Sequence, residues 1–247
     1  MLALTLTTLT AVALAFNVPS VVQPDFIGQS PWQWAHIGFL VAMMGWMPAP
    51  IEVSAWNSLW LIEKQKLQPV SKQQALFDFN FGYLMTAILA VVFLALGRLV
   101  MYGSGEQFSP SGAKFAGQLI SLYSQVMGND SRYLIGAVAF LCIFSTTVTV
   151  IDGYSRTLNM GWQLLTNQQD SERRLNAVMV ALSAFGLFII LFFKGALLPL
   201  LEFVMILAFM TTVVFAWLNY KLMISTVIPA KDRYGTPMRI LSLFGLT

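Results

Sequence analysis

Residues 43–52 read MMGWMPAPIE and interrupt an otherwise apolar segment that runs from residue 37 to residue 62. Pro48 and Pro50 remove two backbone donors and clash with the preceding turn, which disfavours a continuous helix. We therefore predict two half-helices joined by an unwound piece at residues 47–50, near the middle of a membrane span. Unwound backbone at that depth must be buried or must line a cavity. A simple proline kink within a packed helix is the alternative.

The composition indicates a membrane protein. Of the 247 residues, 57% are hydrophobic and only 10% are charged, whereas a soluble domain carries about 25% charged residues. This excludes a soluble enzyme and a disordered chain, and the basic residues are too dispersed for a nucleic-acid partner. One cysteine and one histidine also exclude a disulfide framework and a histidine metal cluster within the chain.

Long windows that lack charged residues predict an all-α, polytopic membrane helix bundle that forms a single domain over residues 1–247. A helix needs about 20 apolar residues to cross a bilayer. The predicted spans lie at about residues 2–22, 37–62 (broken at 47–50), 79–100, 133–151, 175–193 and 196–220, with a partial span at 240–247.

The loops predict the orientation and two further helical features. Alternate loops carry most of the basic residues, so we expect a multi-pass protein of a bacterial plasma membrane with a cytoplasmic N-terminus. Ser71 and Gln74 fit a capping box before the third span. Between Pro110 and Gly128, apolar residues recur at helical spacing, which predicts an amphipathic helix on the outer interface.

Three stretches of the sequence resemble the Nramp family of divalent metal transporters, and bacterial Nramp-related proteins in particular. They are GWMPAPIEVS at residues 45–54, FDFNFGY at residues 77–83 and TTVTVIDGY at residues 146–154. The resemblance covers nearly the whole chain and implies part of the inverted-repeat fold of the APC superfamily, from the fifth helix to the start of the eleventh. The family's Asp-Pro-Gly-Asn motif, which supplies two metal ligands, is absent, so we expect a fragment of a transporter.

The resemblance also implies two metal ligands in this chain, the thioether of Met47 and the backbone carbonyl of Met44. A thioether is a soft ligand and favours transition metals over Ca²⁺ or Mg²⁺. Met47 as a simple core residue is the alternative. Ala49 stands where most family members carry a histidine that is implicated in proton handling, which leaves proton coupling open.

Two acidic residues lie inside predicted spans and are candidates for a proton or cation pathway. Glu52 follows the break, and its alternative role is to face the positive end of a half-helix that begins at Pro50. Glu202 lies in the sixth span, where its alternative role is an ion pair with Lys194.

Polar residues near the inner ends of two spans extend this candidate pathway. Ser145, Thr149 and Asp152 share one face of the fourth span, and an ion pair of Asp152 with Arg156 is the alternative. Asn80 begins the third span, where it also suits a structural gate or cap.

The sequence thus predicts a secondary active transporter that moves Mn²⁺ or Fe²⁺ across the lipid bilayer by alternating access, with proton coupling as a further expectation. The metal is a substrate, and no cofactor is expected. A symporter of amino acids or other organic solutes and a non-transporting membrane fragment are the alternatives. Paired acid–base motifs are absent, which disfavours an intramembrane enzyme.

Overall fold

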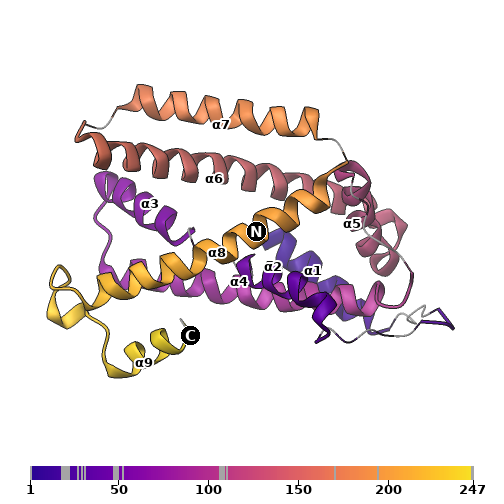
Figure 1. Cartoon of the computed structure of the whole chain (residues 1–247). Coiled ribbons are helices and arrows are strands. Elements are labelled where there is room, and N and C mark those ends of the chain that lie inside the picture. Colours follow the sequence, from indigo (N-terminus) through magenta and orange to yellow (C-terminus); the bar gives the residue numbers. More distant parts are fainter. Residues whose placement is uncertain are drawn as a thin grey trace. The chain divides into compact units, whose positions relative to one another are not determined.

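The computed structural model describes residues 2–17, 23–26, 28, 30, 32–46, 50–51, 53–105, 109, 111–169, 171–193 and 195–245. Every regular element within these residues is helical (Figure 1). The α-helices are α1 (Leu2–Ala15), α2 (Ile37–Trp46), α3 (Val53–Leu67), α4 (Lys72–Val100), α5 (Gly112–Met127), α6 (Arg132–Thr166), α7 (Glu172–Phe192), α8 (Leu197–Ile224) and α9 (Thr236–Phe244). Single 3-10 turns lie at Trp34–His36, Asn129–Ser131 and Ala230–Asp232.

Four of the described helices, α4, α6, α7 and α8, are long and apolar enough to cross a membrane. Each exceeds the roughly 20 residues that a bilayer requires. The helices α1 and α2 are also apolar but shorter. The all-helical membrane class predicted from the sequence is therefore supported.

The chain divides into two compact units where the sequence predicts one domain. The first comprises residues 1–30 and 55–200, and the second comprises residues 31–54 and 201–247. The chain passes from the second unit to the first between Ser54 and Ala55, just after α3 begins.

The core of the first unit lies where α1, α4, α5 and α6 meet. Its buried residues are Ala11, Ala15, Leu96, Leu122, Tyr123 and Ile135. The alanines of α1 allow its backbone to approach the neighbouring helices closely. The Thr8 and Tyr123 hydroxyls are hydrogen-bonded to each other at 3.0 Å within this core.

Two local predictions are confirmed. The Ser71 hydroxyl accepts a hydrogen bond from the Gln74 backbone N–H, the Gln74 side chain accepts one from the Ser71 N–H, and α4 begins at this capping box. The amphipathic helix predicted before Gly128 is α5. Its apolar face packs against α1, α4 and α6, so protein covers the side that the sequence assigned to the interface.

Several helices have bounds that differ from those of the predicted spans. The helix α1 covers Leu2–Ala15, and the Asn17 N–H bonds to the Leu14 carbonyl in the turn that follows. Residues 18–22 of the first predicted span lie outside the described residues. The helix α6 continues past residue 151 to Thr166 and ends at Asn167, which adopts a left-handed conformation (φ 56°). The helix α9 begins at Thr236, earlier than the predicted residue 240, with a proline in its first turn.

Within the second unit, α2 lies directly on the backbone of α8 at Gly45. A Cβ atom there would meet the carbonyl oxygen of Met205 and would lie 2.8 Å from the backbone nitrogen of Phe209. Only glycine permits this approach. Gly45 therefore has a packing role in the contact of α2 with α8.

Candidate functional site

The segment in which the sequence predicts a broken helix holds two separate helices among the described residues. The helix α2 ends at Trp46 and α3 begins at Val53. Met47, Pro48, Ala49 and Glu52 lie outside the described residues, so the proposed thioether ligand and the acid after the break are not placed.

The chain enters α3 through a hydrogen-bonded turn. The Val53 N–H donates to the Pro50 carbonyl at 3.1 Å, and the Ser54 N–H and hydroxyl donate to the Ile51 carbonyl at 3.1 and 2.6 Å. The helix therefore starts at Val53, and the prediction that Pro50 occupies its first position is wrong. The sequence still places Glu52 immediately before the helix begins.

Two carbonyl groups at the end of α2 lack their usual helical donors. In an α-helix, the carbonyls of Met44 and Trp46 would accept from the N–H groups of residues 48 and 50. Both of those residues are proline, which has no N–H. These carbonyl oxygens therefore need other partners, and Met44 is the residue for which the resemblance implies a carbonyl ligand. The Met44 side chain is 62% exposed.

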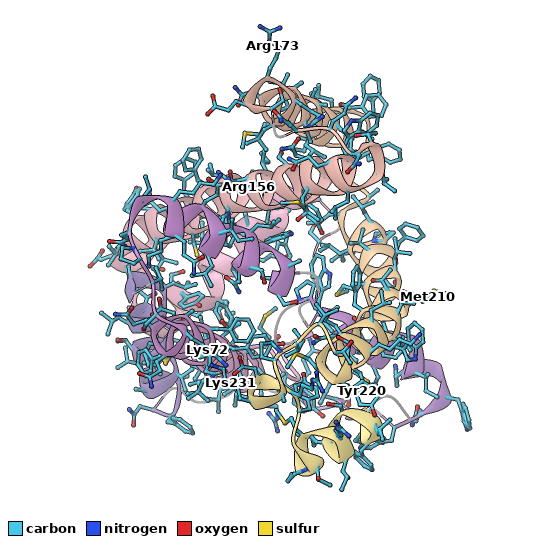
Figure 2. All side chains as sticks on the ribbon, turned by 90° about the vertical axis from the view of Figure 1, so that its left-hand side faces the viewer. Lys72, Arg156, Arg173, Met210, Tyr220 and Lys231 are labelled. Carbon is cyan, nitrogen blue, oxygen red and sulfur yellow. The ribbon has the colours of Figure 1, made fainter. Side chains whose placement is uncertain are left out.

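A second polar site joins α3 to α6 through Asp152. The Trp60 Nε1–H donates to Asp152 Oδ2 at 2.7 Å, and the Arg156 Nε–H donates to both carboxylate oxygens at 3.0 and 2.9 Å. The pairing of Asp152 with Arg156, given above as the alternative, is thus observed. Arg156 also lies 3.9 Å from the Glu63 carboxylate of α3, and Figure 2 shows it on the flank of α6 beside α3.

Close packing of an indole accompanies these polar contacts. Trp56 of α3 is buried and lies against Gly153 of α6. Its ring also meets the Tyr154 ring edge-on, with centroids 4.8 Å apart. Aromatic pairs in this geometry favour a fixed arrangement of the two helices.

The corner between α6 and α7 is held by Arg174. The Arg174 Nε–H donates to Oδ1 of Asn159 at 2.7 Å, and Nη2 of the same guanidinium donates to the Gln169 carbonyl at 2.9 Å. Asn159 is only 5% exposed, so this bond satisfies a buried amide. The neighbouring Arg173 points away from the two helices (Figure 2).

A cavity of about 210 Å³ lies between α3, α6 and α7, next to this polar network. Glu63 and Lys66 line it from α3, Arg156 and Asn159 line it from α6, and Glu172 lines it from α7. Charges of both signs therefore face the same small space.

The other predicted pathway residues do not join the Asp152 network in the described structure. Ser145 and Thr149 are exposed on α6, and the Thr149 hydroxyl donates to the Ser145 carbonyl of its own helix at 2.9 Å. Asn80 is exposed on α4 and Glu202 is exposed on α8. Lys194, the alternative partner of Glu202, lies outside the described residues.

Sequence reasoning did not find Trp60, Glu63, Asn159 or Arg174. One usable signal was the spacing of Trp56 and Trp60, which places two large side chains on one face of a helix four residues apart. Buried Asn159 gave no such signal, because its partner Arg174 belongs to the next helix.

Comparisons with known proteins give one relative. An uncharacterized protein of Pasteurella multocida (strain Pm70) is 46% identical over 250 aligned residues, which cover 100% of this chain and 57% of that protein. The chain thus spans little more than half the length of the relative. No protein-family model and no solved structure matches the chain.

Proposed function

We propose that this chain forms part of a secondary active transporter for divalent transition-metal cations such as Mn²⁺ or Fe²⁺, similar to the Nramp family and working by alternating access. The observation that carries the proposal is the end of α2 at Trp46 and the start of α3 at Val53 within one apolar segment. Transporters place substrate and ion sites at such interruptions, where unwound carbonyls and half-helix ends coordinate ions.

The donors at this break suit a transition metal. Pro48 and Pro50 have no N–H to donate to the carbonyls of Met44 and Trp46, which lie four residues earlier. The thioether of Met47 follows directly after Trp46 in the sequence. Carbonyl oxygen alone would serve hard cations, whereas sulfur shifts the preference toward the first-row transition metals. The proposed site therefore combines the thioether of Met47 with the carbonyl of Met44.

This chain supplies only part of a coordination shell in the proposal. The described residues contain no group of three His, Cys, Asp or Glu side chains that could hold a metal. The resemblance assigns two further ligands to an Asp-Pro-Gly-Asn motif that this sequence lacks. Glu52 and Glu202 are the proposed proton or cation carriers, because the expected histidine is replaced by Ala49.

Uptake of radiolabelled Mn²⁺ into vesicles that carry the full-length gene product tests the proposal. Met47→Ala should lower the uptake rate by about tenfold and should reduce the preference for Mn²⁺ over Ca²⁺. Met44→Ala is the matched control, because it removes an exposed thioether but keeps the backbone carbonyl, and it should transport at the wild-type rate.

Two outcomes would count against the proposal. Equal effects of the two methionine substitutions would remove Met47 as a specific ligand. Uptake of an amino acid or another organic solute, with no response to metal, would favour the organic-solute symporter instead.

A further inference from the structure

We propose that Trp60 and Asp152 are positioning residues of a latch that holds α3 against α6 and must open during each transport cycle. The latch comprises Trp56 and Trp60 of α3 with Asp152, Gly153 and Arg156 of α6. This inference rests on the proposed transport function, since α3 is the second half of the discontinuous helix.

One carboxylate receives hydrogen bonds from both helices. The indole N–H of Trp60 reaches Asp152 Oδ2 from α3, and the guanidinium of Arg156 reaches both oxygens from α6 itself. Hydrogen bonds to an ionised acceptor are stronger than neutral ones. Arg156 fixes the carboxylate, so Asp152 presents a preset acceptor to the indole of the other helix.

The shape of α6 complements these bonds. Gly153 leaves room for the Trp56 ring directly beside the Asp152 backbone, and a Cβ atom at residue 153 would lie 2.6 Å from that ring. Trp56 is the one buried residue of α3, all of whose residues are described. Both indoles of α3 therefore contact α6, Trp56 at Gly153 and Trp60 at Asp152.

The latch is strong enough to position α3 and also able to open. The side chains of Asp152 and Arg156 are each 27% exposed, so protein does not fully enclose the ion pair. When the indole leaves, Asp152 keeps its bonds from Arg156 of the same helix, so no uncompensated charge remains. Such a contact suits a two-state element.

The helix α3 is connected to the proposed cation site along the chain. Trp56 lies within the first turn of α3 and Trp60 lies one turn further on. The same rigid helix begins only a few residues after Met44 and Trp46, whose carbonyls lack helical donors. In the proposal, release of the indoles is therefore passed along the chain toward Met44 and Trp46.

Thiol labelling tests the latch without any substrate. A reporter Leu59→Cys, at a residue that lines the cavity between α3, α6 and α7, is placed in the full-length protein after every native cysteine, Cys142 included, has been replaced by serine. A bulky maleimide is applied to membrane fragments, in which it reaches both faces. Trp60→Phe, which removes the N–H, should raise the labelling rate of residue 59 by about tenfold.

Matched controls make the result specific. Trp162→Phe alters an exposed indole on α6 and should leave the labelling of residue 59 unchanged. A second reporter, Leu165→Cys, lies at an exposed site near the end of α6 and should label equally in every variant. Equal acceleration by Trp162→Phe would overturn the latch.

A second variant guards against a folding defect in the first. Asp152→Leu combined with Arg156→Met removes both charges and the acceptor of the Trp60 N–H together, and it should accelerate labelling as Trp60→Phe does. Unchanged labelling in both the Trp60 variant and this double variant would overturn the latch.

Parallel Mn²⁺ uptake separates the latch from the proposed function. Trp60→Phe should change the maximal uptake rate at least threefold, with KM for Mn²⁺ within about twofold, because Trp60 does not touch the cation. A change confined to KM would overturn its role as a positioning residue. Accelerated labelling in a protein that takes up no metal would support the latch and refute the metal substrate.

Discussion

Gly153 of α6 touches the indole of Trp56 of α3 so closely that a methyl group at residue 153 would lie 2.6 Å from Cδ2 of the ring. Gly153→Ala should therefore lower the free energy of unfolding by about 1–3 kcal/mol through overpacking. Gly161→Ala is the control, because a Cβ there meets nothing within 4 Å and alanine favours a helix. Thermal unfolding in detergent measures both, and a Gly153→Ala protein as stable as the control would refute the tight fit.

Gly45 provides a similar test in the second unit. Gly45→Ala would press a methyl group on the backbone of α8 at Met205 and Phe209. Backbone yields less readily than a side-chain end, so we expect a loss of about 2–3 kcal/mol. Gly38→Ala lies in open space on the same helix and should be neutral or slightly stabilising. Equal melting temperatures for the two variants would contradict the observed contact.

The buried hydrogen bond between Thr8 and Tyr123 predicts which of two substitutions lowers the free energy of unfolding more. Thr8→Val leaves the Tyr123 hydroxyl without its partner and should cost about 1–3 kcal/mol. Tyr123→Phe should cost less, about 1 kcal/mol, because the Thr8 hydroxyl still donates to the Leu4 carbonyl at 2.7 Å. Denaturation of the single and double variants gives the coupling energy, and a coupling energy near zero would exclude the bond as a stabilising contact.

Tyr123 also predicts a loss of stability at high pH. The residue is 3% exposed, and burial raises the pKa of its hydroxyl above the ordinary value of 10.0. The unfolded chain therefore loses this proton at a lower pH than the folded chain does. The stabilising contribution is complete below about pH 10 and declines as the pH rises toward the folded pKa. Between about pH 8 and pH 10.5, the melting temperature of the wild type should fall further than that of Tyr123→Phe.

Glu52 is predicted to act as a proton or cation carrier. Glu52→Gln should flatten the pH dependence of Mn²⁺ uptake, because glutamine cannot ionise. Glu52→Asp keeps the charge and should retain a sloped profile. If the uptake profile of Glu52→Gln matched the wild type while its melting temperature fell, Glu52 would be assigned to the positive end of α3.

Features set by neighbouring residues were predictable from the sequence. The capping box of α4, the amphipathic pattern of α5 and the interruption after Trp46 each depend on a few adjacent side chains, and each is present in the structure. The apolar windows of α7 and α8 were located within a few residues for the same reason.

Features that join distant parts of the chain were not predictable in this way. Trp60 and Asp152 are 92 positions apart, and their bond depends on how α3 meets α6. The shared face of Ser145, Thr149 and Asp152 follows from helix geometry, but it does not reveal that Thr149 bonds within its own helix. The apolar windows also underestimated the length of α6, because its last turns carry polar residues that lower the mean hydropathy of any window containing them.

The length of α6 has a consequence for depth in the lipid. Tyr133 and Trp162 are both exposed near its two ends, and a straight helix separates them by about 44 Å. That distance equals the thickness of a bilayer with its headgroup layers, where such amphipathic rings prefer to reside. With one ring in each headgroup layer, Asp152 would lie about 28 Å from the Tyr133 end, which is inside the hydrocarbon layer and about 6 Å beyond its midplane.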